Sequence, residues 1–111
     1  MTAKNISNQF DFKILSDGNI NSGNVSGVFC CDLLSLAMSK LPARAAWVTV
    51  MGNVNTLAVA SLTEASCIIL AEDIQPDEST IKKAQEQNIM VMKSPYPVFE
   101  TAEMVYKFIN A

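Results

Sequence analysis

Gly52-Asn53-Val54-Asn55 is the segment best suited to bind a ligand, because it follows an apolar run and precedes a stretch rich in small residues. If that stretch is a helix, its first backbone amides can bind a phosphate or a carboxylate. A plain turn followed by a helix cap is the competing interpretation. The segment has neither the lysine of a Walker loop nor the glycine triplet of a dinucleotide fingerprint.

Three carboxylates stand where apolar runs end. Glu72 and Asp73 follow Cys67–Ala71, and Asp32 follows Val25–Cys30. Carboxylates hold Mg²⁺ in many proteins. Adjacent residues that leave a strand usually point in opposite directions, so a solvated strand end is favoured over a metal site.

The absence of histidine removes the usual activator of serine and cysteine nucleophiles and the commonest metal ligand. Cys30, Cys31 and Cys67 lack CxxC spacing, so no zinc or iron–sulfur site is indicated, and we expect buried, reduced thiols. No catalytic residue, metal or cofactor is predicted. We therefore expect that the protein is not an enzyme.

Composition indicates one domain. The chain has 111 residues, 50% of them hydrophobic and 17% charged, which suffices for a core without disulfides. No apolar run reaches the ~18 residues of a membrane-spanning helix, and residues 1–12 lack the apolar block of a secretory signal. The net charge is −3 and the basic residues are scattered, which argues against binding to nucleic acid. We expect a cytoplasmic protein that contacts no membrane.

Apolar patterning predicts the elements that position these residues. We expect flexibility in residues 1–9, a strand over Phe10–Leu15 and a loop over Asn19–Asn24. Strands and helices then alternate. The expected strands are Val25–Cys30, Trp47–Met51, Cys67–Ala71 and Ile89–Met92. The first expected helix is capped by Asp32, the second is Thr56–Glu64, and the third begins at Pro76-Asp77-Glu78. The last helix has an apolar inner face formed by Phe99, Ala102, Val105, Tyr106 and Ile109.

This alternation is typical of an α/β fold with a mostly parallel sheet and helices on both faces. Ligands of such sheets bind outside the carboxyl ends of the strands. The candidate ligand-binding residues at that edge are Asp32, Gly52, Asn53, Asn55, Glu72 and Ser94.

A distributed set of segments spans about residues 12–109. They are Asp32-Leu33-Leu34-Ser35, Trp47-Val48-Thr49-Val50, Ala58-Val59-Ala60-Ser61-Leu62-Thr63, Ile68-Ile69-Leu70, Pro76-Asp77-Glu78 and Ile89. In these segments the chain resembles the DRTGG domain family. The resemblance implies a compact, non-catalytic α/β module of the kind found in phosphotransacetylases and some CBS-domain pyrophosphatases. Such modules are associated with regulation and subunit contact.

The residues that name the family are altered here. The Asp-Arg pair falls on Asn53 and Val54, and the Thr-Gly-Gly falls on Ala71-Glu72-Asp73. We predict a regulatory or assembly module that acts by forming a homodimer and by binding a larger metabolic or redox partner. The alternative is a sensor that binds a nucleotide or another small anion at the carboxyl ends of the strands.

Overall fold

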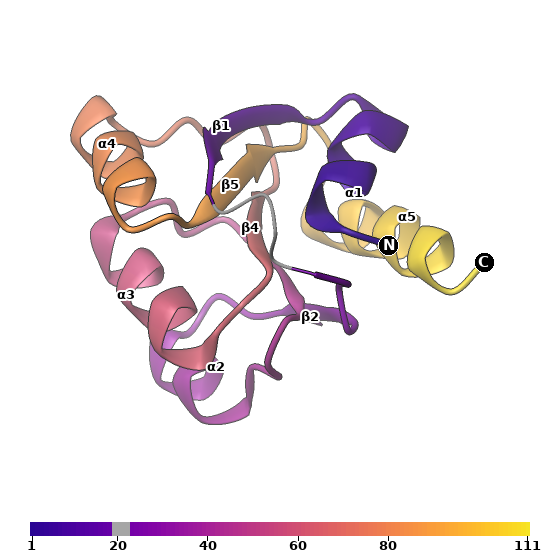
Figure 1. Ribbon diagram of the computed structural model, residues 1–111, viewed down its shortest axis with the longest axis horizontal. Helices are drawn as coiled ribbons and strands as arrows, with labels where there is room; N and C mark the ends of the chain where they lie inside the picture. Colours follow the sequence, from indigo (N-terminus) through magenta and orange to yellow (C-terminus); the bar gives the residue numbers. More distant parts are fainter. Residues whose placement is uncertain (19–22) are drawn as a thin grey trace.

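One five-stranded sheet, in the order β1-β5-β4-β3-β2, organises the molecule (Figure 1). The computed structural model describes residues 1–18 and 23–111, so most of the loop expected over Asn19–Asn24 lies outside the described residues. The strands are β1 (Lys13–Asp17), β2 (Val28–Cys30), β3 (Ala46–Thr49), β4 (Cys67–Leu70) and β5 (Met90–Lys93). The helices are α1 (Ala3–Phe10), α2 (Leu34–Lys40), α3 (Val54–Thr63), α4 (Glu78–Glu86) and α5 (Val98–Ile109).

Strands β2 to β5 run parallel, and β1 pairs antiparallel with β5 at one edge. From β2 onwards the chain alternates strictly between strand and helix. These observations confirm the predicted α/β fold with a mostly parallel sheet. Within the described residues, no helix combines the length and the apolar character needed to cross a membrane.

Helices cover both faces of the sheet, with α1 and α5 on one face and α2, α3 and α4 on the other (Figure 1). Side chains of β4 alternate between the two layers: Cys67 and Ile69 pack towards α1 and α5, and Ile68 and Leu70 pack towards the other three helices. All four are buried. This explains the unbroken apolar run, because a strand covered on both faces has no polar alternation.

Trp47 of β3 anchors the edge next to β2. Its side chain is fully buried, and its indole Nε1 donates a hydrogen bond of 3.0 Å to the carbonyl oxygen of Cys31. A buried indole needs such an acceptor, since an unpaired N–H would cost free energy. The bond therefore fixes the loop that follows β2 against the neighbouring strand.

The amino-terminal segment differs from the prediction, because helix α1 spans Ala3–Phe10, where no helix was expected, and the strand expected over Phe10–Leu15 starts later and runs over Lys13–Asp17. Thr2 and Asn5 form a reciprocal capping box at the start of α1, and Ile6 is fully buried. Phe10 ends the helix, where its ring lies 5.4 Å from Phe12 and 5.6 Å from Phe108. The alternating phenylalanines therefore mark a helix end and a turn, and the strand begins only at Lys13.

Helix α5 exists as expected, but its buried stripe is shifted. Thr101 and Val105 are fully buried, whereas Phe99 is 70% and Tyr106 is 60% exposed. The prediction that Phe99 and Tyr106 face inwards is therefore wrong. The cause is Thr101, whose hydroxyl lies 2.8 Å from that of Ser94 and donates to the carbonyl oxygen of Tyr96, so that a polar residue turns inwards.

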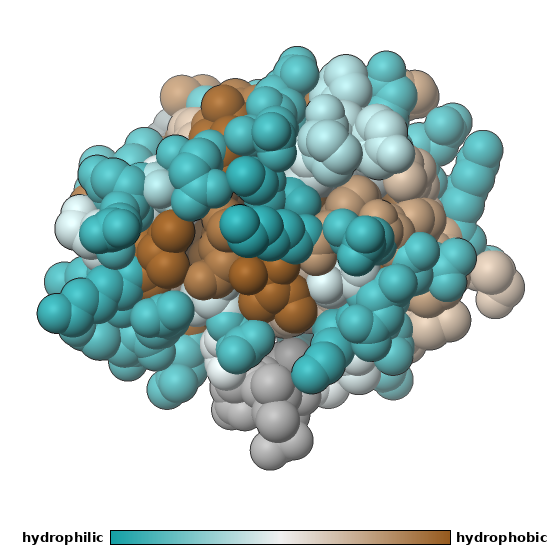
Figure 2. Space-filling view, turned by 90° about the horizontal axis from the view of Figure 1, so that it is seen from above, coloured by the Kyte–Doolittle hydropathy of each residue, from teal (hydrophilic) through white to brown (hydrophobic). Residues whose placement is uncertain are grey.

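Figure 2 views the molecule from the side on which β1 lies in Figure 1. It shows hydrophobic atoms in the middle of a mostly hydrophilic face. On β1, Ile14 and Leu15 are half-buried, while Lys13 and Asp17 at its two ends are exposed. The sheet edge on this side is therefore framed by charged residues.

Candidate functional site

Asp32 lies where β2 and β3 end, but it is not a helix cap. Leu33 occupies the N-cap position of α2 and makes no side-chain hydrogen bond there. The Asp32 carboxylate instead accepts from Thr49 Oγ1 at 2.7 Å and from the Val50 amide at 3.0 Å. The prediction of a cap is therefore wrong, because the Asp32 carboxylate oxygen instead accepts both hydrogen bonds from residues at the end of β3.

The segment from Gly52 to Asn55 opens helix α3 as the sequence suggested. Asn53 is its N-cap, and the Oδ1 atom accepts from the amides of Asn55 at 2.9 Å and Thr56 at 3.2 Å. The cap therefore already uses two of the amides that an anion would seek. A side chain at Gly52 would place its Cβ 3.2 Å from Leu70 Cδ1, so glycine allows close packing on β4.

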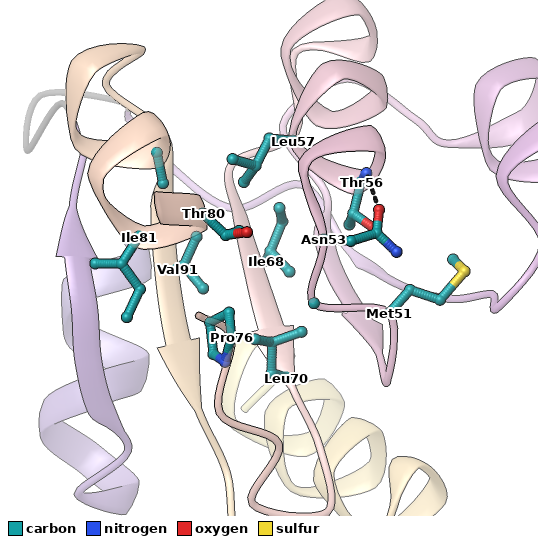
Figure 3. Close-up of a pocket in the computed structure, with 12 residues that line it drawn as sticks. Met51, Asn53, Thr56, Leu57, Ile68, Leu70, Pro76, Thr80, Ile81 and Val91 are labelled. Carbon is teal, nitrogen blue, oxygen red and sulfur yellow. Dashed lines mark hydrogen bonds between the residues drawn. The ribbon is translucent and has the colours of Figure 1, made fainter. Parts of the chain in front are cut away.

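A narrow cavity of about 10 Å³ lies between α3 and α4, directly above β4. Figure 3 shows Thr80 and Ile81 of α4 on one side, Thr56 of α3 on the other, and Ile68 and Leu70 of β4 between them. This volume is close to the minimum for one water molecule. The cavity therefore admits a single small group and excludes a base or a sugar unless the two helices separate.

Thr56 is the unusual member of this wall. It is 1% exposed, and its Oγ1 atom has no hydrogen-bond partner among the described residues. An unpaired buried hydroxyl costs roughly 1–3 kcal/mol, so such an atom invites a ligand group or a water molecule. Sequence reasoning missed it because a threonine in the first turn of a helix is commonplace.

Glu72 and Ser94 belong to a second group at the ends of β4 and β5. Glu72 and Asp73 both have left-handed backbones, and their amides donate to the carbonyl oxygens of Tyr96 and Ser94 at 2.8 Å each. Asp73 also forms an ion pair of 3.4 Å with Lys93. The carboxylates are thus carried by a turn that is fixed through its backbone.

Ser94 is fully buried, and its hydroxyl accepts from the Tyr96 amide at 3.2 Å. It lies inside this turn, where its contacts are with the base of α5. The structure therefore separates the six candidates into two groups, with Asp32, Gly52, Asn53 and Asn55 around the start of α3, and Glu72 and Ser94 in the other turn. Over residues 1–18 and 23–111, no three carboxylate or thiol side chains converge on a common point.

The thiols are distributed differently from expectation. Cys67 is fully buried, but Cys31 is half-buried and Cys30 is exposed. Burial raises the pKa of Cys67 to about 12. Partial burial, together with the charges of Asp32 and Cys31, raises the pKa of Cys30 as well. Both pKa values favour the neutral thiol, which disfavours a nucleophilic role.

The comparisons with known proteins concern the family and the fold of this chain. A family model described as the DRTGG domain matches residues 5–108. The search of curated proteins finds no match to this chain.

One solved structure has the same fold with a TM-score of 0.74 at 14% sequence identity, over 95% of this chain. It holds the CBS and DRTGG domains of the regulatory region of Clostridium perfringens pyrophosphatase, in complex with the activator diadenosine tetraphosphate. The present chain spans 46% of that chain.

Proposed function

Since the chain belongs to the DRTGG domain family, we propose that it is a non-catalytic regulatory module that acts by forming a homodimer and by binding a larger partner protein. The neighbour of the same fold lies in the regulatory region of a larger enzyme. The observation that carries the proposal is the face formed by helix α5 and the edge strand β2, here called the α5–β2 face. It comprises Val28, Cys30, Phe99, Ala102, Glu103 and Tyr106.

The α5–β2 face has the composition of a contact surface. Phe99 and Tyr106 are 70% and 60% exposed, and they border a shallow hollow of about 360 Å³. Aromatic side chains are enriched in protein interfaces, where they bury a large area at a small cost in side-chain entropy. Two such rings on one helix face are more than scattered exposure would explain.

The edge strand β2 strengthens this interpretation. Its residues Val28, Phe29 and Cys30 carry no charge, and within residues 1–18 and 23–111 the strand pairs on one side, with β3. The opposite edge, β1, has Lys13 and Asp17 at its ends and an irregular register between Ile14 and Ser16. Charges and bulges are devices that prevent pairing of edge strands. The β1 edge is therefore protected, and the β2 edge is open to a partner.

In the proposed homodimer, two α5–β2 faces meet around a two-fold axis. The short β2 strands contribute few hydrogen bonds, so the rings of Phe99 and Tyr106 supply most of the buried apolar area. A specific interface buries about 800 Å² on each partner, which the rings alone cannot provide. The other residues of the face, such as Val28 and Ala102, must therefore add to the buried area.

Sedimentation velocity over a wide range of protein concentrations tests this proposal. We expect a dimer that dissociates on dilution. A protein that remains monomeric at the highest concentration, and that captures no partner from lysate, would overturn it.

The alternative function, a sensor for a nucleotide or another small anion, is favoured by Thr56. The unpartnered Thr56 hydroxyl lies in the first turn of α3, where the helix dipole favours negative charge. The small cavity beside Thr56 presents only apolar surface, so an anion at the start of α3 would lie outside the cavity, near Asn53 and Asn55.

A thermal-shift screen with nucleotides, including diadenosine tetraphosphate, and inorganic phosphate tests this alternative, because a ligand that binds only the folded state raises the melting temperature. A positive result requires that Thr56→Val reduces the shift. No shift at millimolar ligand would exclude the sensor.

A further inference from the structure

A larger cavity of about 430 Å³ lies at the amino-terminal ends of the parallel strands, where β4 and β5 begin and α3 and α4 end. Its volume exceeds that of the cavity beside Thr56 by far, and it is of the size of common small-molecule sites. None of the six candidate residues from the sequence lines it. It is therefore a separate place on the molecule, independent of the α5–β2 face.

Ser66 borders this cavity and carries a hydroxyl group without a hydrogen-bond partner among the described residues. The residue is 7% exposed, lines the cavity, and precedes β4 directly. Its Oγ atom has no hydrogen-bond partner in the part of the chain that the structure describes. Most buried hydroxyls in proteins are paired. The unpaired Ser66 Oγ atom is itself shielded from solvent, so it lies behind the cavity wall and the other lining groups must carry the binding of a ligand.

Arg44 and Glu64 supply opposite charges on the same wall. The Arg44 amide donates a hydrogen bond of 2.8 Å to the carbonyl oxygen of Glu64, so the two residues are neighbours through their backbones. Their side chains nevertheless form no ion pair with each other; the ion pairs recorded for the described residues are Lys93–Asp73 and Lys107–Glu103. The cavity is therefore lined by one basic and one acidic residue whose charged groups do not pair with each other.

The carboxyl ends of helices α3 and α4 add the electrostatic effect of their helix dipoles. Glu64 caps the carboxyl end of α3, and Gln87 caps the carboxyl end of α4, and both residues line the cavity. The carboxyl end of a helix carries partial negative charge, which favours a cation. An ammonium group is thus stabilised between these helix ends and Glu64, while the Arg44 fork matches a carboxylate.

We infer that this cavity binds a small zwitterion of the α-amino acid class, with its carboxylate on Arg44 and its ammonium group on Glu64 and the ends of α3 and α4. Ala60, Ile89 and Met90 contribute apolar surface to the same wall. An amino acid with an aliphatic side chain therefore fits better than a charged one. The site lies far from the start of α3, at the other end of that helix.

Backbone amide NMR spectra of the full chain, titrated with L-leucine, 4-methylpentanoate and 3-methylbutylamine, test the inference. The last two compounds are leucine without its ammonium group and without its carboxylate. We expect L-leucine to shift the amides of Arg44, Glu64, Ser66 and Asn88, and each analogue to bind roughly tenfold or more weakly, because one charge-assisted contact is lost.

Variants separate binding from folding. Arg44 and Glu64 both have left-handed backbones, so Arg44→Asn and Glu64→Asn remove each charge with a residue that tolerates this conformation. Asp11→Asn is the matched control, because Asp11 is a left-handed acid that caps α1 away from the cavity. Arg44→Asn and Glu64→Asn should each weaken L-leucine binding, and Asp11→Asn should not.

Three results would overturn the inference: no amide shifts with any of the three compounds, shifts confined to the start of α3, or equal affinity for L-leucine and 4-methylpentanoate.

Discussion

Thr49 donates a hydrogen bond of 2.7 Å from its buried hydroxyl to the exposed carboxylate of Asp32, which ties the loop after β2 to the end of β3. The same hydroxyl accepts from the Met51 amide at 3.2 Å, and the same carboxylate oxygen accepts from the Val50 amide. These contacts set the path of the turn that leads to Gly52 and helix α3. Asp32 therefore shapes the site from the loop that follows β2.

Asp32→Ala should lower the free energy of unfolding by about 1–3 kcal/mol, because the buried Thr49 hydroxyl loses its acceptor. Urea unfolding of the wild type and the variant measures this loss. Asp32→Asn is the control, since it retains an oxygen acceptor and should be less destabilising. Unchanged stability of the alanine variant would contradict the role assigned to Asp32.

Asn53→Ala should destabilise the protein by ~1 kcal/mol, because the cap of α3 loses two hydrogen bonds. Asn55→Ala is the matched control, as the structure records no side-chain hydrogen bond for Asn55. Thermal unfolding of both variants decides the matter. If Asn55→Ala proves as damaging as Asn53→Ala, the assignment of the cap is incorrect.

The central strands and their helices could be predicted because their physics is local. Trp47 and Ile68–Leu70 form unbroken apolar runs, and Asn53 and Asp77 are cap residues directly before helices. The amino-terminal helix was missed because its burial depends on Ile6 and a Thr2–Asn5 capping box within a polar segment. The buried face of α5 was predicted wrongly because a buried threonine, Thr101, interrupts the hydrophobic pattern.

The site was less predictable than the fold, because its members depend on tertiary contacts. The sequence indicated that Gly52, Asn53 and Asn55 start a helix. The sequence contained no signal that the Thr49 hydroxyl would form a hydrogen bond with Asp32, or that Ser94 would be buried against Thr101. Unpaired hydroxyls such as those of Thr56 and Ser66 are visible only when all neighbours are in place.

Gly18→Ala should be strongly destabilising. Gly18 has a φ of +59°, and an added Cβ would lie 2.4 Å from the Met90 backbone nitrogen. Gly23→Ala is the control, because Gly23 also has a positive φ, +80°, but no atom of the described residues lies within 4 Å of an added Cβ. We expect a loss of ~1 kcal/mol for Gly23→Ala and roughly 1–3 kcal/mol more for Gly18→Ala, measured by urea unfolding. Equal losses of stability in the two variants would contradict the expected clash between the added Cβ at residue 18 and the Met90 backbone.

Cys67 should resist alkylation in the folded protein, while Cys30 reacts, because Cys67 is fully buried and Cys30 is exposed. Mass spectrometry after iodoacetamide treatment, with and without urea, distinguishes the two thiols. Labelling of Cys67 at the same rate as Cys30 without denaturant would contradict the burial of β4.

The raised pKa of Cys67 also predicts a dependence of stability on pH. The thiol keeps its proton up to about pH 12 when folded, but in the unfolded chain it ionises at its ordinary pKa. The free energy of unfolding is therefore unaffected below that ordinary pKa and falls as the pH rises above it. Comparison with Cys67→Ala isolates this contribution, which should be absent from the variant.

The measurement that tests the proposed homodimer most directly is sedimentation velocity on a pair of matched variants. Phe99 and Leu62 are both 70% exposed, but Phe99 lies on the α5–β2 face and Leu62 on α3 across the sheet. Loss of an aromatic anchor from an interface commonly costs about 2 kcal/mol or more. We predict that the wild type and Leu62→Lys form dimers with similar dissociation constants, and that Phe99→Lys stays monomeric over the same concentrations. A monomeric wild type, or equal association of the two variants, would contradict the account.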